Sequence, residues 1–219
     1  MVPGMDAAPG RWAEATVTLA ERDPAMAGVI ARVGPCTLAR RRVAGGFFGA
    51  LARSILYQQL AGRAAAVIHG RFVALFDGRP TPEAVLVTDD EALRGAGLSA
   101  AKAASIKDLA AKVADGTVRL DGISALPDEE VLARLVAVRG IGRWTGEMFL
   151  IFQLNRPDVW PVGDLGVRSG YARMHRLPAL PTPAQLAALG DAYRPYRTVA
   201  AWYCWRAVDA GGVDADLGW

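Results

Sequence analysis

Apolar residues recur at three- and four-residue spacing along most of this chain, and alternating apolar and polar runs are missing. This spacing predicts amphipathic helices, because residues three or four positions apart lie on the same helix face. The segment GFFGALARSILYQQL (46–60) places Phe47, Leu51, Ile55 and Leu60 along one apolar face. We therefore expect an all-α fold.

The expected helices are separated by segments that contain glycine, proline or asparagine. Pro24 suits the first turn of a helix, and Asp128 is expected to cap a helix that ends near Val138. The other helices are expected over 12–21, 25–33, 46–60, 62–76, 82–87, 89–95, 99–114, 143–153, 165–174, 183–190 and 195–209. Residues 1–22 are expected to be an N-terminal segment, and 23–219 one domain of two helical lobes around a cleft.

Composition excludes several classes of protein. Hydrophobic residues make up 52% of the chain and charged residues 21%, which is typical of a globular enzyme and not of a disordered chain. The longest apolar run, MFLIF (148–152), is far below the roughly 18 residues that a membrane span needs. The N-terminus shows no apolar signal core, so we expect a cytoplasmic protein with no membrane association. Nothing in the sequence predicts an obligate oligomer, so we expect a monomer.

Two cysteines and a small net charge say little about partners. Cys36 and Cys204 cannot supply a cysteine-ligated iron–sulfur cluster or a zinc finger, and we expect both as core residues. The net charge of +3 is weak support for a nucleic-acid partner. Arginine outnumbers lysine 22 to 3, and its planar guanidinium suits contacts with phosphate.

The segment LVAVRGIGRWTGEMFLIF (135–152) is expected to be two helices joined by Gly140-Ile141-Gly142. The glycines permit positive φ and leave backbone N–H groups unshielded by a Cβ atom. These groups lie at the N-terminus of the second helix, where an anion such as a phosphate is attracted. Ile141 is expected to insert into the core. The alternative is an ordinary helix–helix turn, for which glycine is the usual residue.

Asp164 lies 22 residues beyond Gly142 in a loop rich in proline and glycine, VWPVGDLGVRSG (159–170). An aspartate that opens a helix is often only an N-cap. At this distance behind the hairpin it is also a candidate catalytic carboxylate. Both interpretations can hold together, because a helix N-terminus stabilises an ionised carboxylate.

The hairpin pattern L-x-x-V-R-G-I-G-R-W-T and the aspartate loop together resemble the helix-hairpin-helix DNA glycosylase superfamily. The resemblance extends from about Asp23 to Trp205 and is to the 3-methyladenine DNA glycosylase II branch. It rests on the segments DPAMAGVIARVGPC (23–36), SILYQQLAGRAA (54–65), RPDVWPVGDLGVR (156–168) and YRPYRTVAAWYCW (193–205). Some bacterial members carry an additional sheet-containing domain, for which we expect no room before Asp23.

The resemblance implies a base excision repair enzyme that hydrolyses the N-glycosidic bond of alkylated purines, such as 3-methyladenine and 7-methylguanine, in double-stranded DNA. The damaged base is first rotated out of the duplex. Asp164 then stabilises the positive charge on the sugar and orients or deprotonates the attacking water.

The resemblance also implies roles for aromatic residues and for the end of an early helix. Tyr57-Gln58-Gln59-Leu60 matches the segment that enters the DNA, with Gln58 or Gln59 filling the gap; the alternative is a solvent-facing amide pair. Trp144 stands where strand-cleaving relatives carry a lysine nucleophile, so water is expected as the nucleophile. The residues implied to line the base pocket are Trp144, Trp205, Tyr57 and Met148, and those implied to contact DNA include Arg143 and Thr145.

No cofactor is expected to be required. Hairpins of this family commonly bind a monovalent cation, Na⁺ or K⁺, through main-chain carbonyls, here those of Val136, Val138 and Ile141. His69 and His175 are isolated in the sequence and are expected to be structural or surface residues.

Three functional hypotheses remain open at this stage. The first is the alkylated-purine glycosylase without lyase activity. The second keeps the fold and changes the lesion to a deaminated base such as uracil or hypoxanthine. The third is a non-enzymatic helix-hairpin-helix module that only binds DNA.

Overall fold

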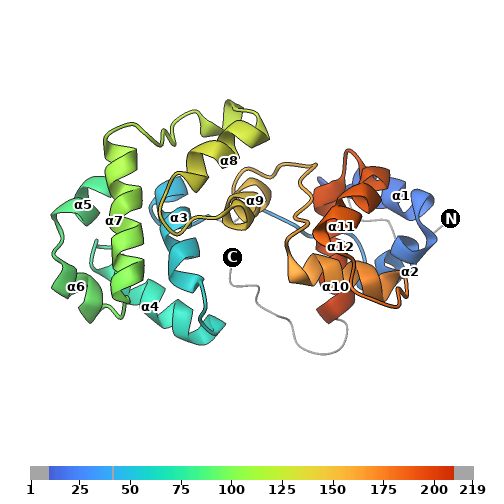
Figure 1. The fold of residues 1–219 in the computed structure, drawn as a ribbon, viewed down its shortest axis with the longest axis horizontal. Coiled ribbons are helices and arrows are strands. Elements are labelled where there is room, and N and C mark those ends of the chain that lie inside the picture. The colour runs from blue at the N-terminus through green and yellow to red at the C-terminus, as the bar shows by residue number, and fades with distance from the viewer. Residues whose placement is uncertain (1–9, 41, 210–219) are drawn as a thin grey trace. The chain divides into compact units, whose positions relative to one another are not determined.

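The structure, a computed structural model, describes residues 10–40 and 42–209. Within these ranges it has twelve α-helices, two short 3₁₀ helices and no strand (Figure 1). The all-α prediction is confirmed. Residues 1–9 of the expected N-terminal segment lie outside the described residues.

The chain folds into two compact helical units. Unit 1 combines residues 10–39 with 155–209, and unit 2 comprises the intervening residues to Leu154. The first expected helix belongs to unit 1, and Trp12 at its start is buried.

Unit 1 is built around its last helix. Its elements are α1 (Ala13–Arg22), α2 (Pro24–Val33), α10 (Leu165–Met174), α11 (Pro183–Leu189), the 3₁₀ helix η2 (Gly190–Tyr193) and α12 (Arg197–Asp209). Helix α12 packs against α10, α2 and α1, and every residue from Thr198 to Trp205 is buried. Gly170 allows α10 to approach this closely, because a Cβ atom there would lie 1.9 Å from the carbonyl oxygen of Cys204.

Unit 2 contains the helices of the middle part of the chain, between the two segments that form unit 1. They are α3 (Gly46–Tyr57), α4 (Gly62–Ala74), α5 (Pro82–Val87), α6 (Asp90–Gly95), α7 (Ala100–Ala114), η1 (Ile123–Ala125), α8 (Asp128–Val136) and α9 (Arg143–Phe152). Helix α7 lies against α3, α5 and α6 (Figure 1). Helices α8 and α9 pack on each other, and Gly146 permits this because a Cβ atom there would lie 2.6 Å from Leu132 Cδ2.

Three local predictions were wrong. Asp128 does not cap α8; Pro127 holds the N-cap position, and Asp128 is the first helical residue, where its charge still favours the helix N-terminus. Helix α3 ends at Tyr57 and not at Leu60, because the backbone leaves the helical region at Gln58, with a ψ of 132°, and Gln59 then adopts a left-handed φ of 58°. The buried face of α3 uses Phe48, whereas Phe47 is half-buried and Leu60 is exposed.

No helix in the described ranges is long and apolar enough to cross a membrane. The longest, α7, has 15 residues.

Candidate active site

The two glycines of the hairpin between α8 and α9 have different conformations. Gly140 has a φ of +79°, and a Cβ atom there would lie 2.8 Å from Ser105 Oγ. Gly142 is extended, with a φ of −92°, and forms the N-cap of α9; a Cβ atom there would meet nothing within 4 Å. Ile141 between them is buried, as expected, and its N–H donates to the Val138 carbonyl at 3.1 Å. Glycine is therefore required by conformation at 140, whereas at 142 it leaves open space beside the helix N-terminus.

Helix α7 fixes the chain that enters the hairpin. Asp108 Oδ2 accepts a hydrogen bond from the Arg139 N–H at 2.7 Å and another from Lys112 Nζ at 2.7 Å. Lys112 Nζ also donates to the Ala137 carbonyl at 2.7 Å. Desolvation opposes ionisation of Asp108, but the hydrogen bonds from Lys112 and Arg139 outweigh it and lower the pKa of this carboxyl. Neither side chain was predicted from the sequence, although their i, i+4 spacing on a helix is a recognisable signal.

The end of α3 also contacts the hairpin. Gln58 Nε2 donates to the Gly140 carbonyl at 2.9 Å. The next residue, Gln59, has the left-handed backbone, and both Gln59 and Leu60 are exposed. Tyr57 is half-buried beneath the guanidinium of Arg53, which lies 4.0 Å from its ring centroid. The two glutamines, equivalent in the sequence, are thus distinguished by their contacts.

The remaining residues expected on α9 are placed as follows. Arg143 forms ion pairs with Glu129 at 2.7 Å and Glu147 at 3.2 Å, and the hydrogen bond with Glu129 is the main cause of its raised pKa. Thr145 and Met148 are buried, and Trp144 is half-buried. Met148 lines a crevice of only about 10 Å³, which is too small to hold a base.

In unit 1, Asp164 caps α10, as one interpretation of the sequence predicted. Its Oδ1 atom accepts hydrogen bonds from the Val167 N–H at 2.7 Å and from Trp205 Nε1 at 2.9 Å. Asp164 and Trp205 are both buried. The capping role is therefore established, and it is compatible with a catalytic one.

The loop before Asp164 is attached to the rest of unit 1 at several points. Trp160 Nε1 donates to the Leu186 carbonyl at 2.8 Å, and the Val159 N–H donates to Thr198 Oγ1 at 3.0 Å. Arg197 forms an ion pair with Asp158 at 2.7 Å. These contacts fix the backbone on which Asp164 is carried.

Cys36, Cys204 and His175 lie in environments that suit a structural role. Burial raises the pKa of Cys36 to about 12, and burial also raises that of Cys204 far above its usual value. His175 is not isolated in space: its ring stacks on Tyr171, and its Nε2 atom lies 3.2 Å from Asp23 Oδ2. The same Asp23 oxygen accepts a hydrogen bond from the Tyr193 hydroxyl at 2.6 Å, so the cluster joins α2, α10 and η2. The described residues contain no group of three His, Cys, Asp or Glu side chains that could hold a metal ion.

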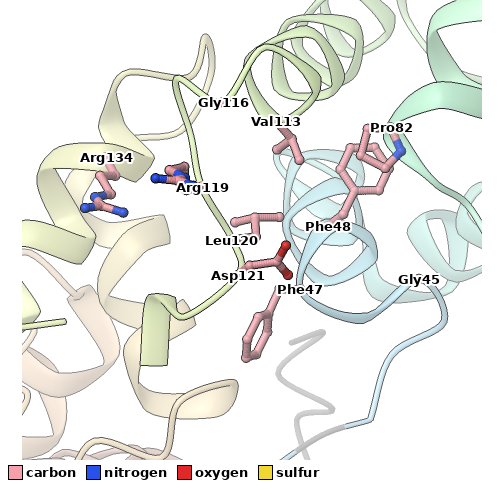
Figure 2. Close-up of a pocket in the computed structure, with 10 residues that line it drawn as sticks. All are labelled: Gly45, Phe47, Phe48, Pro82, Val113, Gly116, Arg119, Leu120, Asp121 and Arg134. Atoms are coloured by element: carbon pink, nitrogen blue, oxygen red, sulfur yellow. The ribbon is translucent and has the colours of Figure 1, made fainter. Parts of the chain in front are cut away.

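A hollow of about 480 Å³ in unit 2 contains none of the predicted site residues. Figure 2 shows its lining, which includes Phe48, Arg119, Asp121 and Arg134. We therefore do not connect it with the chemistry of Asp164 or with the hairpin.

Comparison with solved structures defines the class of protein. The 3-methyladenine DNA glycosylase of Schizosaccharomyces pombe, in complex with abasic DNA, matches with a TM-score of 0.78 and 37% identity over 88% of this chain and 95% of that one. The DNA-3-methyladenine glycosidase of Bacillus halodurans matches with a TM-score of 0.79 and 34% identity over 88% of both chains. The fold is that of the DNA glycosylases.

Sequence relatives and a family model identify the family. DNA-3-methyladenine glycosylase 1 of S. pombe is 42% identical, over 71% of this chain and 70% of its own length. DNA-3-methyladenine glycosylase 2 of Escherichia coli is 27% identical, over 70% of this chain and 55% of its own length. The model described as HhH-GPD superfamily base excision DNA repair protein matches residues 52–195, and the chain belongs to this family. It is a DNA repair enzyme of the glycosylase class, a hydrolase that acts on N-glycosyl bonds.

Proposed function

We propose that this protein releases alkylated purines, such as 3-methyladenine and 7-methylguanine, from double-stranded DNA by hydrolysis, with Asp164 as the catalytic carboxylate. The observation that carries the proposal is the environment of Asp164. It is a buried carboxylate that receives two N–H donors at one oxygen, in a chain of a base excision repair family.

The chemistry requires a group of this kind. Cleavage of an N-glycosidic bond builds positive charge on the sugar, and a fixed anion beside the sugar stabilises that charge. Asp164 also orients the attacking water, as a general base within hydrogen-bond reach would. An alkylated purine is itself cationic and leaves without further protonation. Because Trp144 provides no amine, we propose that the product is an intact strand with an abasic site.

The hairpin supplies the contact with DNA. The space beside Gly142 allows a phosphate to approach the exposed N–H groups at the start of α9. Such a contact is independent of base sequence. In the first turn of α9, Arg143 is engaged by glutamates and Thr145 is buried, so we assign the binding energy mainly to the hairpin backbone.

The contacts of the two glutamines favour Gln59 as the residue that fills the gap left by the everted base. Gln58 is used within unit 2, where it donates to the Gly140 carbonyl. Gln59 is exposed, and its left-handed backbone presents it at the turn together with Leu60.

Aromatic rings form the base pocket in this proposal. An aromatic face attracts a cationic base by cation–π contact, worth about 0.5–2 kcal/mol for each favourable pair. In unit 2 the half-buried Trp144 is the candidate for this contact, whereas the ring of Tyr57 already carries the Arg53 guanidinium. Trp205 belongs to unit 1 and is buried there. Met148 is buried in a narrow crevice and contributes packing to α9.

No cofactor is needed for this chemistry, and a monovalent cation at the hairpin is compatible with the residues present. The carbonyls of Val136, Val138 and Ile141 lie at the end of α8 and in the turn, where a helix C-terminus favours a cation. The Val138 carbonyl accepts the Ile141 N–H and still has a second lone pair. If bound, Na⁺ or K⁺ would supply a positive charge beside a DNA phosphate.

The test is a panel of duplex oligonucleotides that each carry one lesion, scored for release of free base by the protein. Release of alkylated purines, with strand breaks only after hot alkali, is the expected result. Preferential release of uracil or hypoxanthine would replace the proposed substrate class, and DNA binding without any release would leave a binding module. Since the proposed substrate is DNA, we propose that the enzyme works in the cytoplasm, at the nucleoid if the cell is bacterial.

A further inference from the structure

One oxygen of Asp164 receives both a main-chain and a side-chain donor, and the two differ in origin. The Val167 N–H belongs to the first turn of α10, the helix that Asp164 itself caps. Trp205 Nε1 comes from α12, 41 residues further along the chain, and donates to the same Oδ1 atom at 2.9 Å. The first bond is the usual result of N-capping, whereas capping alone does not account for the second.

Helix α12 fixes the position of this second donor. It is buried along its whole central part and packs against α10. The Trp205 side chain is therefore held within the core of unit 1, and its N–H has a defined direction. A donor on a rigid helix can hold a carboxylate in one rotamer, which a solvent-exposed donor cannot do.

Gly166 makes the contact sterically possible. A Cβ atom at this position would lie 2.8 Å from Trp205 Cδ1, 3.2 Å from Trp205 Nε1 and 3.1 Å from Asp164 Oδ1. Its φ is not in the left-handed region, so backbone conformation does not require glycine here. A side chain at this position would therefore press against both the indole and the carboxylate.

We infer that Trp205 is a positioning residue for Asp164, and that Gly166 provides the space this contact needs. The inference rests on the proposed function, because it assigns Trp205 a role in the reaction through the catalytic carboxylate. The indole N–H orients the carboxylate plane, so that the carboxylate is already placed when charge develops on the sugar. This role differs from that of an aromatic wall for the base, which depends on the ring face and not on the N–H.

The first test is Trp205→Phe, which keeps an aromatic ring and removes the N–H. We expect the single-turnover rate constant for base release to fall about 10- to 100-fold, the range for losing one hydrogen bond to a charged group. The affinity for duplex DNA that contains a stable abasic site should change less than twofold. The matched control is Trp202→Phe on the same helix. Trp202 packs edge-on against Tyr203 and makes none of the described hydrogen bonds with Asp164. The rate of base release by Trp202→Phe should therefore remain within twofold of the wild type.

Two comparisons separate positioning from base stacking or simple structural damage. The fold-loss in Trp205→Phe should be the same for a cationic and a neutral lesion, whereas a lost cation–π contact would affect the cationic lesion more. In an Asp164→Asn background, Trp205→Phe should cause no further loss, because its effect acts through the carboxylate.

Gly166→Ala is the second variant, and it serves also if Trp205→Phe does not fold. It should reproduce the loss of rate with unchanged DNA affinity while the indole ring remains. Unchanged rates in a folded Trp205→Phe or Gly166→Ala, or losses that add to that of Asp164→Asn, would overturn the inference. If Asp164→Asn alone left base release unchanged, the proposed function itself would fail, so the two failures are distinguishable.

Discussion

The hairpin in unit 2 and the aspartate loop in unit 1 are held by opposite means. At the hairpin, side chains of α7 and α3 bind main-chain groups: Asp108 and Lys112 fix the entry, and Gln58 binds the Gly140 carbonyl. At the aspartate, a main-chain N–H and the Trp205 indole bind the side chain. One region therefore fixes a backbone so that the N–H groups at the start of α9 can contact a phosphate. The other fixes a single functional group, as catalysis demands.

This difference predicts that a substitution of Asp164 lowers the rate of base release, whereas substitutions in the hairpin lower the affinity for DNA. Asp164→Asn keeps the shape of the side chain and removes its charge. Base release should fall on the order of 10²- to 10⁴-fold, the range expected for a group that stabilises or transfers charge in the transition state. Affinity for abasic DNA should remain similar, and single-turnover assays with saturating enzyme would measure the two effects separately. A rate close to wild type would remove this carboxylate from the mechanism.

Substitutions of the two hairpin glycines should lower the affinity for DNA, and to different degrees. Gly140→Ala places a Cβ atom 2.8 Å from Ser105 Oγ at a φ of +79° and should cost about 1–2 kcal/mol of conformational strain. Gly142→Ala has free space and an extended backbone, so the fold should tolerate it, and any loss of DNA affinity then reports on phosphate access.

Thermal unfolding would measure the stability of the Gly140→Ala and Gly142→Ala variants, and equilibrium binding to several unrelated duplexes would measure their affinity for DNA. Both variants should bind every duplex more weakly, each by a factor that does not depend on the duplex. A loss confined to one base sequence would contradict a contact with phosphate.

The smallest effect is expected at Asp108. Because its pKa is lowered in the folded state, the carboxylate contributes stability above its ordinary pKa of 3.8, and this contribution is lost as pH falls through the lower folded value. Asp108→Asn should therefore destabilise the protein by about 1 kcal/mol near neutral pH. The effect is small because the ion pair of Asp108 with Lys112 is partly exposed to solvent. The difference from wild type should shrink as the pH is lowered below 3.8. Urea unfolding at several pH values would test this, and a difference that grew toward acid would contradict it.

The same comparison explains which features could be predicted from the sequence. The hairpin is local: Gly140, Ile141 and the start of α9 lie within a few residues, so spacing and glycine chemistry identified the turn. The capping of α10 by Asp164 is local as well. Helix periodicity predicted most helices to within a few residues, because each buries an apolar face.

Long-range contacts could not be predicted in this way. Trp205 reaches Asp164 across 41 residues, and Gln58 reaches Gly140 across 82. Nothing in the local sequence distinguishes Gln58 from Gln59, or a tryptophan that donates a hydrogen bond from one that only packs. The Asp23, His175 and Tyr193 cluster was missed for the same reason, since its members are isolated along the chain. These features depend on which helices pack together.

The most direct test of the central claim is the affinity for a duplex that carries a positively charged pyrrolidine ring in place of the lesion sugar. If Asp164 lies as an anion beside the sugar, wild-type protein should bind this duplex on the order of 100-fold more tightly than one with a neutral tetrahydrofuran, an effect typical of transition-state mimics. Asp164→Asn should abolish the preference. Equal affinity of the variant and the wild type for the charged duplex would contradict the account.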